Sequence, residues 1–394
     1  MKSVGLLSLP RYENYGSQLQ LWALQTAIEK LGYGCEVIDY VAPPPPPIPL
    51  VQRLWRIVKS PSAFFDGLAR RRYLKHERSL TGTRSRLFDD FSRELLHLGP
   101  KEFASAEALL ADPPQYDACV VGSDQVWNPK GHFGDPSFYL TFADARRRVA
   151  YAPSIGLSEI PADAASWMRE MIAGIECLSI REEQGAALIR QLTSRDAQVV
   201  TDPTLLHTAD DWNRIATPSS RTRPYVLVYA LQADAYVREH VRAIAERHGL
   251  DIVVLPFHES DVLHEHAGVS RAFDVGPREF VGLVRDAALI CTDSFHGTVF
   301  SVIYRRPFLT FRRYDHAGES ATFSRMSDFL ARLGLSERSM DRTTALPASL
   351  MAVDYSDVTP VLDAWRASSW TFLGTSLAHA SAGSDGAPAT APHG

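Results

Sequence analysis

The stretch "ALICTDSFHGTVFSVIYRRPF" (residues 288–308) joins an apolar run, a short polar turn and a second apolar segment of different period. Residues 288–293 predict a buried strand, and the apolar spacing of residues 297–305 is typical of a helix. His296 therefore lies where the strand gives way to the helix. A helix N-terminus carries a positive potential that favours neutral imidazole, whereas a bound anion favours the protonated form. The position fits a cap or loop histidine, and a proton donor that faces an anion is the alternative.

Strands and helices alternate in this way along most of the 394 residues. The alternation stops in the Ser-, Pro- and Arg-rich segment 217–224, which we interpret as a linker, and then restarts. Two such runs predict an α/β protein with two Rossmann-like, doubly wound domains (residues 1–216 and 225–376) that face each other across a cleft. The expected strands are residues 3–9, 35–40, 117–123, 148–154, 177–182, 198–206, 225–231, 251–256, 288–293 and 308–312. The expected helices are residues 17–31, 161–174, 183–193, 233–247, 277–286, 297–305, 324–333 and 357–373.

Three segments do not follow the alternation. The proline run of residues 42–50 predicts an extended surface connector. Residues 51–111 are rich in Arg and Leu, and we expect a helical insertion there that lies on the first domain. Its run Arg70 to Arg72 is most simply a solvated helix face, and peripheral contact with a membrane surface stays open. The polar tail of residues 377–394 predicts a disordered segment.

The bulk composition excludes several classes of function. A formal net charge of −5 gives no reason to expect a nucleic-acid partner. The apolar stretch near the N-terminus is shorter than a signal or membrane segment requires. The four cysteines are scattered without paired spacing, which favours buried reduced thiols in a cytoplasmic protein over a metal or disulfide site. The cysteines therefore give no reason to expect a metal site, and a homo-oligomer stays open.

In doubly wound sheets, ligands bind outside the carboxyl ends of the strands, so the loops at those ends are candidate sites. The first such loop contains Asn14, Tyr15, Gly16 and Ser17. Gly16 permits close approach of a ligand to the backbone, and the helix that follows offers unpaired N–H groups to an anion. An ordinary turn with a serine cap is the alternative interpretation.

Two further loops carry polar side chains at predicted strand ends. The second contains Ser123, Asp124 and Gln125, and Asp124 could bind a hydroxyl or accept its proton; the alternative is an Asx turn. The third begins at Arg181, whose planar guanidinium suits a phosphate or carboxylate. A surface ion pair with a neighbouring glutamate is the alternative for Arg181. The fourth loop is the opening stretch, with Ser294, His296 and Gly297.

A set of motifs in this order resembles the polysaccharide pyruvyl transferase family. The motifs are "NYGSQLQ", "VVGSDQVWNP", "YAPSIG", "SIREEQG", "VTDPTLL", "TDSFHGTVFSVIYRRPF" and "SRMSDFLARLGL", and together they span about residues 3–340. The resemblance implies a GT-B-like fold. It also implies transfer of a pyruvyl unit from phosphoenolpyruvate, the donor substrate, to hydroxyls of a sugar or lipid-linked oligosaccharide. The product would be a pyruvate ketal on a cell-surface glycan or exopolysaccharide precursor, and the resemblance implies that it forms without a metal or a cofactor.

The resemblance also implies roles for individual residues. His296 matches the family's proton donor, Asp124 an acidic residue at the edge of the cleft, and Arg181 an arginine that binds phosphoenolpyruvate. This chain departs from some members in having Ser294 where they have an arginine two residues before the histidine. Arg312 and Arg313, at the end of the next predicted strand, are candidates to replace that cation.

Three alternatives to pyruvyl transfer stay open from the sequence. The first is a GT-B glycosyltransferase that uses a nucleotide sugar, with Glu279 as the arguable acidic residue for the ribose. The second is a family member that has been repurposed in natural-product biosynthesis. The third is a degenerate member that acts as a binding or scaffold protein.

Overall fold

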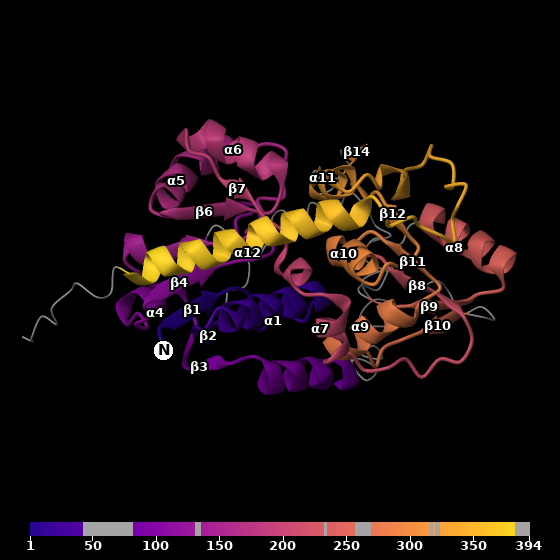
Figure 1. Ribbon diagram of the computed structural model, residues 1–394, viewed down its shortest axis with the longest axis horizontal. Coiled ribbons are helices and arrows are strands. Elements are labelled where there is room, and N and C mark those ends of the chain that lie inside the picture. The colour runs from indigo at the N-terminus through magenta and orange to yellow at the C-terminus, as the bar shows by residue number, and fades with distance from the viewer. Residues whose placement is uncertain are drawn as a thin grey trace, which may run out of the picture.

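The computed structural model describes residues 1–41, 82–130, 135–231, 235–256, 269–315, 318–319 and 324–382. Two parallel sheets organise these residues and lie side by side in Figure 1. The first sheet has the strand order β3-β2-β1-β4-β5-β6-β7, and every neighbouring pair in it is parallel. Its strands are β1 (Ser3–Leu7), β2 (Gly34–Tyr40), β3 (Leu98–Phe103), β4 (Ala118–Val121), β5 (Arg148–Ala150), β6 (Cys177–Ile180) and β7 (Gln198–Val199).

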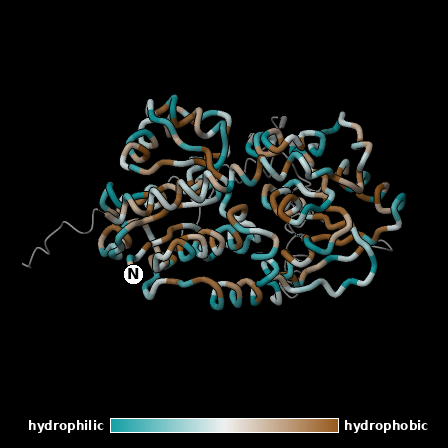
Figure 2. The backbone as a smooth tube through the Cα atoms, viewed as in Figure 1, coloured by the Kyte–Doolittle hydropathy of each residue, from teal (hydrophilic) through white to brown (hydrophobic). Residues whose placement is uncertain are grey.

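The second sheet has the strand order β10-β9-β8-β11-β12-β15 and is also parallel throughout. Its strands are mostly buried and hydrophobic, as the brown segments in Figure 2 show. Both sheets are built from strand–helix units, which confirms the predicted class of two Rossmann-like domains. The strands are β8 (Tyr225–Tyr229), β9 (Asp251–Val254), β10 (Val269–Arg271), β11 (Leu289–Thr292), β12 (Phe308–Phe311) and β15 (Ser339–Met340), with a separate hairpin of β13 (Tyr314–Asp315) and β14 (Gly318–Glu319).

Helix α1 (Tyr15–Lys30) connects β1 to β2 and begins directly after its N-terminal capping residue, Asn14. The side chain of Asn14 accepts a hydrogen bond from the Ser17 N–H, which satisfies one of the unpaired donors of the first turn. Most of α1 is buried, because the helix packs on its own sheet and also contacts two helices of the second domain. The other helices are α4 (Ala106–Ala111), α5 (Ala162–Ala173), α6 (Glu183–Thr193), α7 (Ala209–Asn213), α8 (Ala235–His248), α9 (Pro277–Asp286), α10 (Phe295–Ile303), α11 (Ser324–Arg332), α12 (Val358–Ala382), and the helix of residues 82–95.

The expected helical insertion of residues 51–111 is wrong in its C-terminal part. A helix does cover residues 82–95, but β3 follows it and extends the first sheet beside β2, with Leu98 paired to Val37. The sequence of β3, "LGPKEF", contains Gly and Pro and hides the strand pattern, and Pro is tolerated because β3 lies at the sheet edge. Residues 42–81, with the proline run and Arg70 to Arg72, lie outside the described residues.

The predicted strand of residues 198–206 is also wrong beyond its first two residues. Only β7 forms, and residues Pro203–Leu206 are a turn of 3-10 helix instead. The side chain of Asp202 caps this turn by accepting from the Thr204 N–H, and Pro203 occupies its first position. The change of direction brings Asp202 back over the carboxyl ends of the neighbouring strands.

The long helix α12 contacts the second domain, where Arg332 lies over the Trp365 ring, but it also packs on the first domain and so is not confined to the expected domain of residues 225–376. Figure 1 shows α12 (yellow) running from the second sheet across the first. Trp365 Nε1 donates to the Val199 carbonyl at 3.2 Å, and the Thr201 N–H donates to Ser369 Oγ at 2.9 Å. The helix continues to Ala382, so the expected tail begins too early at residue 377; residues 383–394 lie outside the described residues. Among the helices of the described ranges, none is both long and apolar enough to cross a bilayer.

Candidate active site

The loops at the carboxyl ends of β1, β4, β6, β7 and β11 meet at the junction of the two domains. Asp124 follows β4, Arg181 follows β6, and Asp202 follows β7, all from the first domain. His296 follows β11 and comes from the second domain. Ion-pair contacts link these four side chains, so the junction gathers two carboxylates, one guanidinium and one imidazole in a buried cluster.

His296 lies in the first turn of α10 and is only 6% exposed. Its helix is capped by Ser294, whose Oγ accepts from the Gly297 N–H at 3.4 Å. The imidazole Nε2 lies 3.4 Å from Asp202 Oδ2 but has no hydrogen-bond partner. On its other side the ring packs against Gly16, where an added Cβ would lie 2.0 Å from Nδ1. His296 is therefore held between the domains, with its Nε2 facing the Asp202 carboxylate.

Arg181 and Asp202 form the buried ion pair at the centre of the cluster. Arg181 Nη1 donates to Asp202 Oδ2 at 2.8 Å, and Asp202 Oδ1 accepts from Thr204 N and Oγ1 at 3.0 and 2.7 Å. Burial alone would raise the pKa of Asp202, but the charges of His296 and Arg181 hold this pKa well below its usual value. The alternative for Arg181, a surface ion pair with an adjacent glutamate, does not form. Its Nε and Nη2 groups are buried and lack hydrogen-bond partners.

Asp124 faces the same cluster from the β4 loop. Its Oδ2 accepts from Ser17 Oγ at 2.7 Å, and its Oδ1 lies 3.8 Å from Arg181 Nη2. The residue has a positive φ of 68°, a left-handed conformation that Asp adopts more readily than most residues. Although burial opposes ionisation, the charges of Arg181 and His296 lower the pKa of Asp124. The Asp124 carboxylate is therefore ionised and oriented at neutral pH.

Arg325, at the start of α11, adds a second buried guanidinium. With the Gln125 amide oxygen turned toward it, Gln125 accepts from Arg325 Nη1 and Nη2 at 2.8 and 3.0 Å. The guanidinium carbon of Arg181 lies 4.4 Å from the centre of the Phe295 ring, and that of Arg325 lies 5.8 Å from it. Both cations thus flank one aromatic ring beside His296.

The remaining predicted residues have different surroundings. Tyr15 is fully buried, stacks on Phe280 at 4.8 Å and donates to the Val275 carbonyl, so its side chain serves domain packing. Ser123 Oγ donates to the Ala152 carbonyl at 2.6 Å.

The two arginines predicted to replace a cation beside His296 have different neighbours. Arg312 Nε donates to Ser339 Oγ on β15 at 3.5 Å. Arg313 lies close enough to Arg325 that its positive charge lowers the pKa of Arg325.

Asn14 and Ser294 act as helix caps. Gly297 allows the close approach of Thr292, because a Cβ on Gly297 would lie 2.3 Å from Thr292 Oγ1.

Two residues of the cluster, Asp202 and Arg325, are missing from the sequence-based site. Asp202 follows a strand in the motif "VTDPTLL", so the strand-end rule that selected Asp124 also selects Asp202. Arg325 carries no comparable signal, because it lies beside the apolar positions of α11 and a sequence pattern predicts an exposed arginine there. Its burial follows only from the way α11 packs against the first domain.

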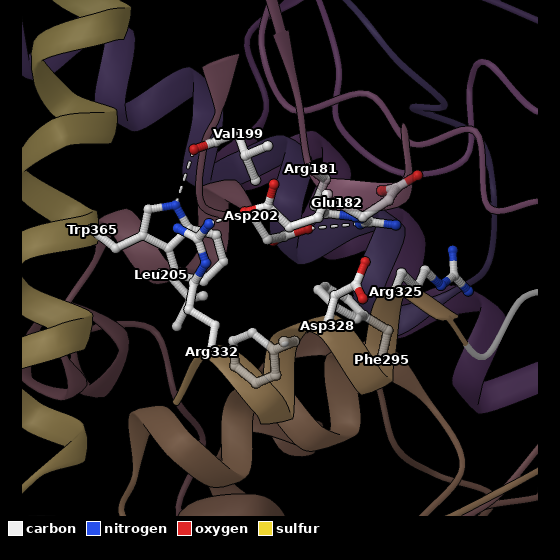
Figure 3. Close-up of a pocket in the computed structure, with 12 residues that line it drawn as sticks. Arg181, Glu182, Val199, Asp202, Leu205, Phe295, Arg325, Asp328, Arg332 and Trp365 are labelled. Carbon is white, nitrogen blue, oxygen red and sulfur yellow. Dashed lines mark hydrogen bonds and ion pairs between the residues drawn. The ribbon is translucent and has the colours of Figure 1, made fainter. Parts of the chain in front are cut away.

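A narrow pocket borders the cluster and is shown in Figure 3. It has room for about one water molecule, with a volume of about 10 Å³. In Figure 3 a dashed line joins Arg181 to Asp202, while Arg325 points away from Trp365 and Arg332 points toward it. Arg181, Asp202 and Arg325 line this pocket, whereas His296 does not.

Solved structures with related folds support the architecture. A structure assigned to a UDP-N-acetylglucosamine 2-epimerase of Listeria monocytogenes matches with a TM-score of 0.51 and 12% identity, over 97% of this chain and 94% of that one. The S. aureus MnaA–UDP co-structure matches with a TM-score of 0.50 and 11% identity, over 92% of this chain and 87% of that one. At these identities the likeness concerns the fold alone, which is GT-B-like. No curated protein matches the chain.

The sequence model of the polysaccharide pyruvyl transferase family matches residues 14–316. This match covers well over half of the chain and includes the loops that bring Asp124, Arg181, Asp202 and His296 together. This chain belongs to the polysaccharide pyruvyl transferase family.

Proposed function

We propose that the protein transfers a pyruvyl unit from phosphoenolpyruvate to two hydroxyls of a sugar or lipid-linked oligosaccharide and releases phosphate. The observation that carries the proposal is the buried Nε2 of His296, 3.4 Å from Asp202, beside the buried Nε and Nη2 of Arg181, which have no hydrogen-bond partner in the protein. Phosphoenolpyruvate carries an enol double bond that can be protonated, and a carboxylate and a phosphate that are anionic. A histidine that gives up a proton and an arginine that binds an anion, both buried in one site, suit such a substrate. Family membership supports the same class of transfer.

The chemistry begins with protonation of the donor. His296, as imidazolium, gives its proton to the methylene carbon of phosphoenolpyruvate, and C2 becomes electrophilic. An acceptor hydroxyl forms a bond to C2, the bond from C2 to the phosphate oxygen breaks, and a second hydroxyl of the acceptor closes the ketal. Of the two hydroxyl protons, one replaces the proton that His296 gave up and the other leaves on phosphate.

The other residues support these steps. Asp202, 3.4 Å from His296 Nε2, orients the ring nitrogen that delivers the proton. Arg181 neutralises the donor's negative charge, and its pairing with Asp202 fixes the plane of the guanidinium. Asp124, which is ionised and held by Ser17, accepts the proton of an attacking hydroxyl and passes it to the departing phosphate.

A specific contact disfavours the rival function of a nucleotide-sugar glycosyltransferase. Glu279 is the arguable ribose-binding residue, yet its Oε2 accepts from the Gly276 N–H and its Oε1 from Thr217 Oγ1. Both carboxylate oxygens of Glu279 thus already accept hydrogen bonds, one from the N-terminus of α9 and one from the linker. A natural-product acceptor in place of a glycan precursor remains an alternative within the same reaction class.

The proposal is tested by incubating the purified protein with phosphoenolpyruvate and a panel of sugar acceptors while phosphate release is followed. Binding of phosphoenolpyruvate and of UDP-N-acetylglucosamine is measured in parallel by calorimetry. We expect acceptor-dependent phosphate release and binding of phosphoenolpyruvate. Binding of the nucleotide sugar without any binding of phosphoenolpyruvate would overturn pyruvyl transfer and favour the glycosyltransferase.

A further inference from the structure

A groove on the first domain borders the loop that leads into α1. It lies between residues 10–13, which follow β1, and the helix of residues 82–95, and it continues to the start of β3. Its volume of about 610 Å³ is in the range of sites that enclose a small molecule of several rings. Asp124, Arg181 and His296 do not line it. The groove therefore offers space for a part of the substrate that the buried cluster does not hold.

Hydrogen bonds fix the two walls of this groove relative to each other. Gln18, in the first turn of α1, is 2% exposed. Its Nε2 donates to the carbonyls of Pro10 and Tyr12 at 2.7 and 3.2 Å, and its Oε1 accepts from Ser92 Oγ, on the opposite wall, at 3.1 Å. A polar side chain buried with its hydrogen bonds satisfied holds its neighbours in place. The groove is therefore preformed in the fold.

The groove leads to Asp124, the proposed base. Gln18 directly follows Ser17, whose hydroxyl donates to Asp124 Oδ2 at 2.7 Å. Tyr12 lies near the same carboxylate, because burial of its hydroxyl and the charge of Asp124 together raise the pKa of Tyr12. Of the aromatic side chains in the described ranges, that of Tyr12 alone is largely exposed, at 52%. An open aromatic face beside a base is a surface on which the apolar face of a sugar ring can stack.

The charges of the groove disfavour an anionic ligand. Each lining side chain that can carry a positive charge is already within ion-pair distance of a carboxylate, the pairs being Arg11 with Asp39, Arg93 with Asp90, and His97 with Glu29. Glu13 and Asp89 add two carboxylates to the lining. An anion would thus meet like charge and no unpaired cation among the described lining residues. A neutral ligand with many hydroxyls suits this lining, because its hydroxyls can donate to the carboxylates.

We propose that this groove binds the acceptor as a neutral, hydroxyl-rich oligosaccharide, and that Tyr12 is a specificity-determining residue on which the sugar that receives the pyruvyl unit stacks. The stacked ring presents its hydroxyls toward Asp124, and the rest of the glycan lies along the helix of residues 82–95. An anionic lipid carrier, where the acceptor has one, lies outside the groove. The inference rests on the proposed function for the role of the bound sugar as acceptor, whereas binding of the glycan does not depend on it.

The test measures retention of the fluorescently labelled protein on an array of immobilised oligosaccharides. The array carries neutral glycans of glucose, galactose, mannose and N-acetylglucosamine, and matched glycans that contain a uronic acid. Wild type is compared with Tyr12→Ala, Tyr12→Phe and a control, Leu110→Ala. Phe keeps the aromatic face and removes the hydroxyl. Leu110 is an apolar side chain of α4 that is 47% exposed and does not line the groove. Thermal unfolding checks that each variant is folded.

We expect wild type to prefer neutral over uronic-acid glycans, and Tyr12→Ala to weaken retention by about tenfold at an unchanged Tm. Tyr12→Phe should weaken it by less than about threefold, and the control by less than about twofold. Absence of glycan binding by wild type would overturn the proposal, as would preference for acidic glycans or equal retention of Tyr12→Ala. Tyr12-dependent glycan binding without phosphate release from phosphoenolpyruvate would support the groove while pyruvyl transfer fails.

Discussion

The imidazole of His296 occupies the space that a side chain at Gly16 would need, since a Cβ on Gly16 would lie 2.0 Å from His296 Nδ1. The two residues come from different domains, Gly16 from the first turn of α1 and His296 from the first turn of α10. The absence of a side chain at Gly16 therefore sets how closely the second domain can bring its histidine to Asp202. Domain closure and placement of the candidate proton donor depend on the same contact.

Replacing Gly16 by Ala should displace His296 or separate the domains. A displacement of about 1 Å at a reacting group can cost on the order of 100-fold in rate, so we expect a loss of kcat of that size. Steady-state phosphate release measures it. Gly374→Ala is the matched control, because a Cβ there would meet only Leu31 at 3.6 Å. Wild-type kcat in Gly16→Ala would show that the contact does not position His296.

Replacing Asp202 by Asn should destabilise the fold more at neutral than at acidic pH. The change leaves the buried Arg181 without the nearer of its two ion-pair partners, which we expect to cost about 3 kcal/mol. The pKa of Asp202 is lowered in the folded state, so its contribution is present above the unfolded pKa near 4 and is lost as pH falls further. Denaturant unfolding from neutral pH to about pH 3 checks this. A stability gap that stays constant or widens on acidification would contradict the assignment.

Ser17 and Asp124 should act together on the acceptor side of the reaction. Asp124→Asn removes the proposed base, and Ser17→Ala removes the hydroxyl that holds its Oδ2 at 2.7 Å. We expect a loss of about 100-fold or more in kcat for the first variant and about tenfold for the second. The double variant should lose little beyond Asp124→Asn alone. Additive losses in a double-mutant cycle would show that the two side chains act separately.

Replacing Trp365 in α12 should lower both the stability of the protein and its activity. Its indole is 8% exposed, and Nε1 donates to the Val199 carbonyl, three residues before Asp202. Trp365→Ala should lower the free energy of unfolding by about 3 kcal/mol through loss of packing. It should also reduce kcat, because the segment that carries Asp202 loses its support. Trp365→Phe, which keeps most of the packing, should retain most of the stability; equal losses in both variants would contradict this account.

The sequence predicts the fold class and much of the site because strand ends and helix starts carry local signals. Apolar runs and helix caps predict that Asp124, Arg181 and His296 follow the carboxyl ends of strands, as they do. Because the strands of each sheet are parallel, those ends lie on the same edge of the sheet, and the three side chains belong to one cluster. Asp202 carries the same signal, although the apolar pattern of residues 198–206 predicts a strand there. Its turn of 3-10 helix is instead set by the Asp202–Pro203 pair.

Long-range packing accounts for what the sequence does not reveal. The path of α12 depends on contacts such as Trp365 with Val199, which lie far apart in the chain. The burial of Arg325 depends on how α11 meets the first domain, and no local pattern distinguishes it from an exposed helical arginine. The edge strand β3 forms by pairing with β2 in spite of a sequence that disfavours strands.

The central claim, that His296 delivers a proton to phosphoenolpyruvate, is tested most directly by comparing wild type with His296→Ala at saturating donor. Phosphate release is followed with an acceptor active in the panel, and calorimetry confirms that both proteins bind phosphoenolpyruvate. We predict that the variant binds the donor while its rate of phosphate release falls by about 100- to 10,000-fold. Release at the wild-type rate from a variant that binds the donor normally would contradict the account.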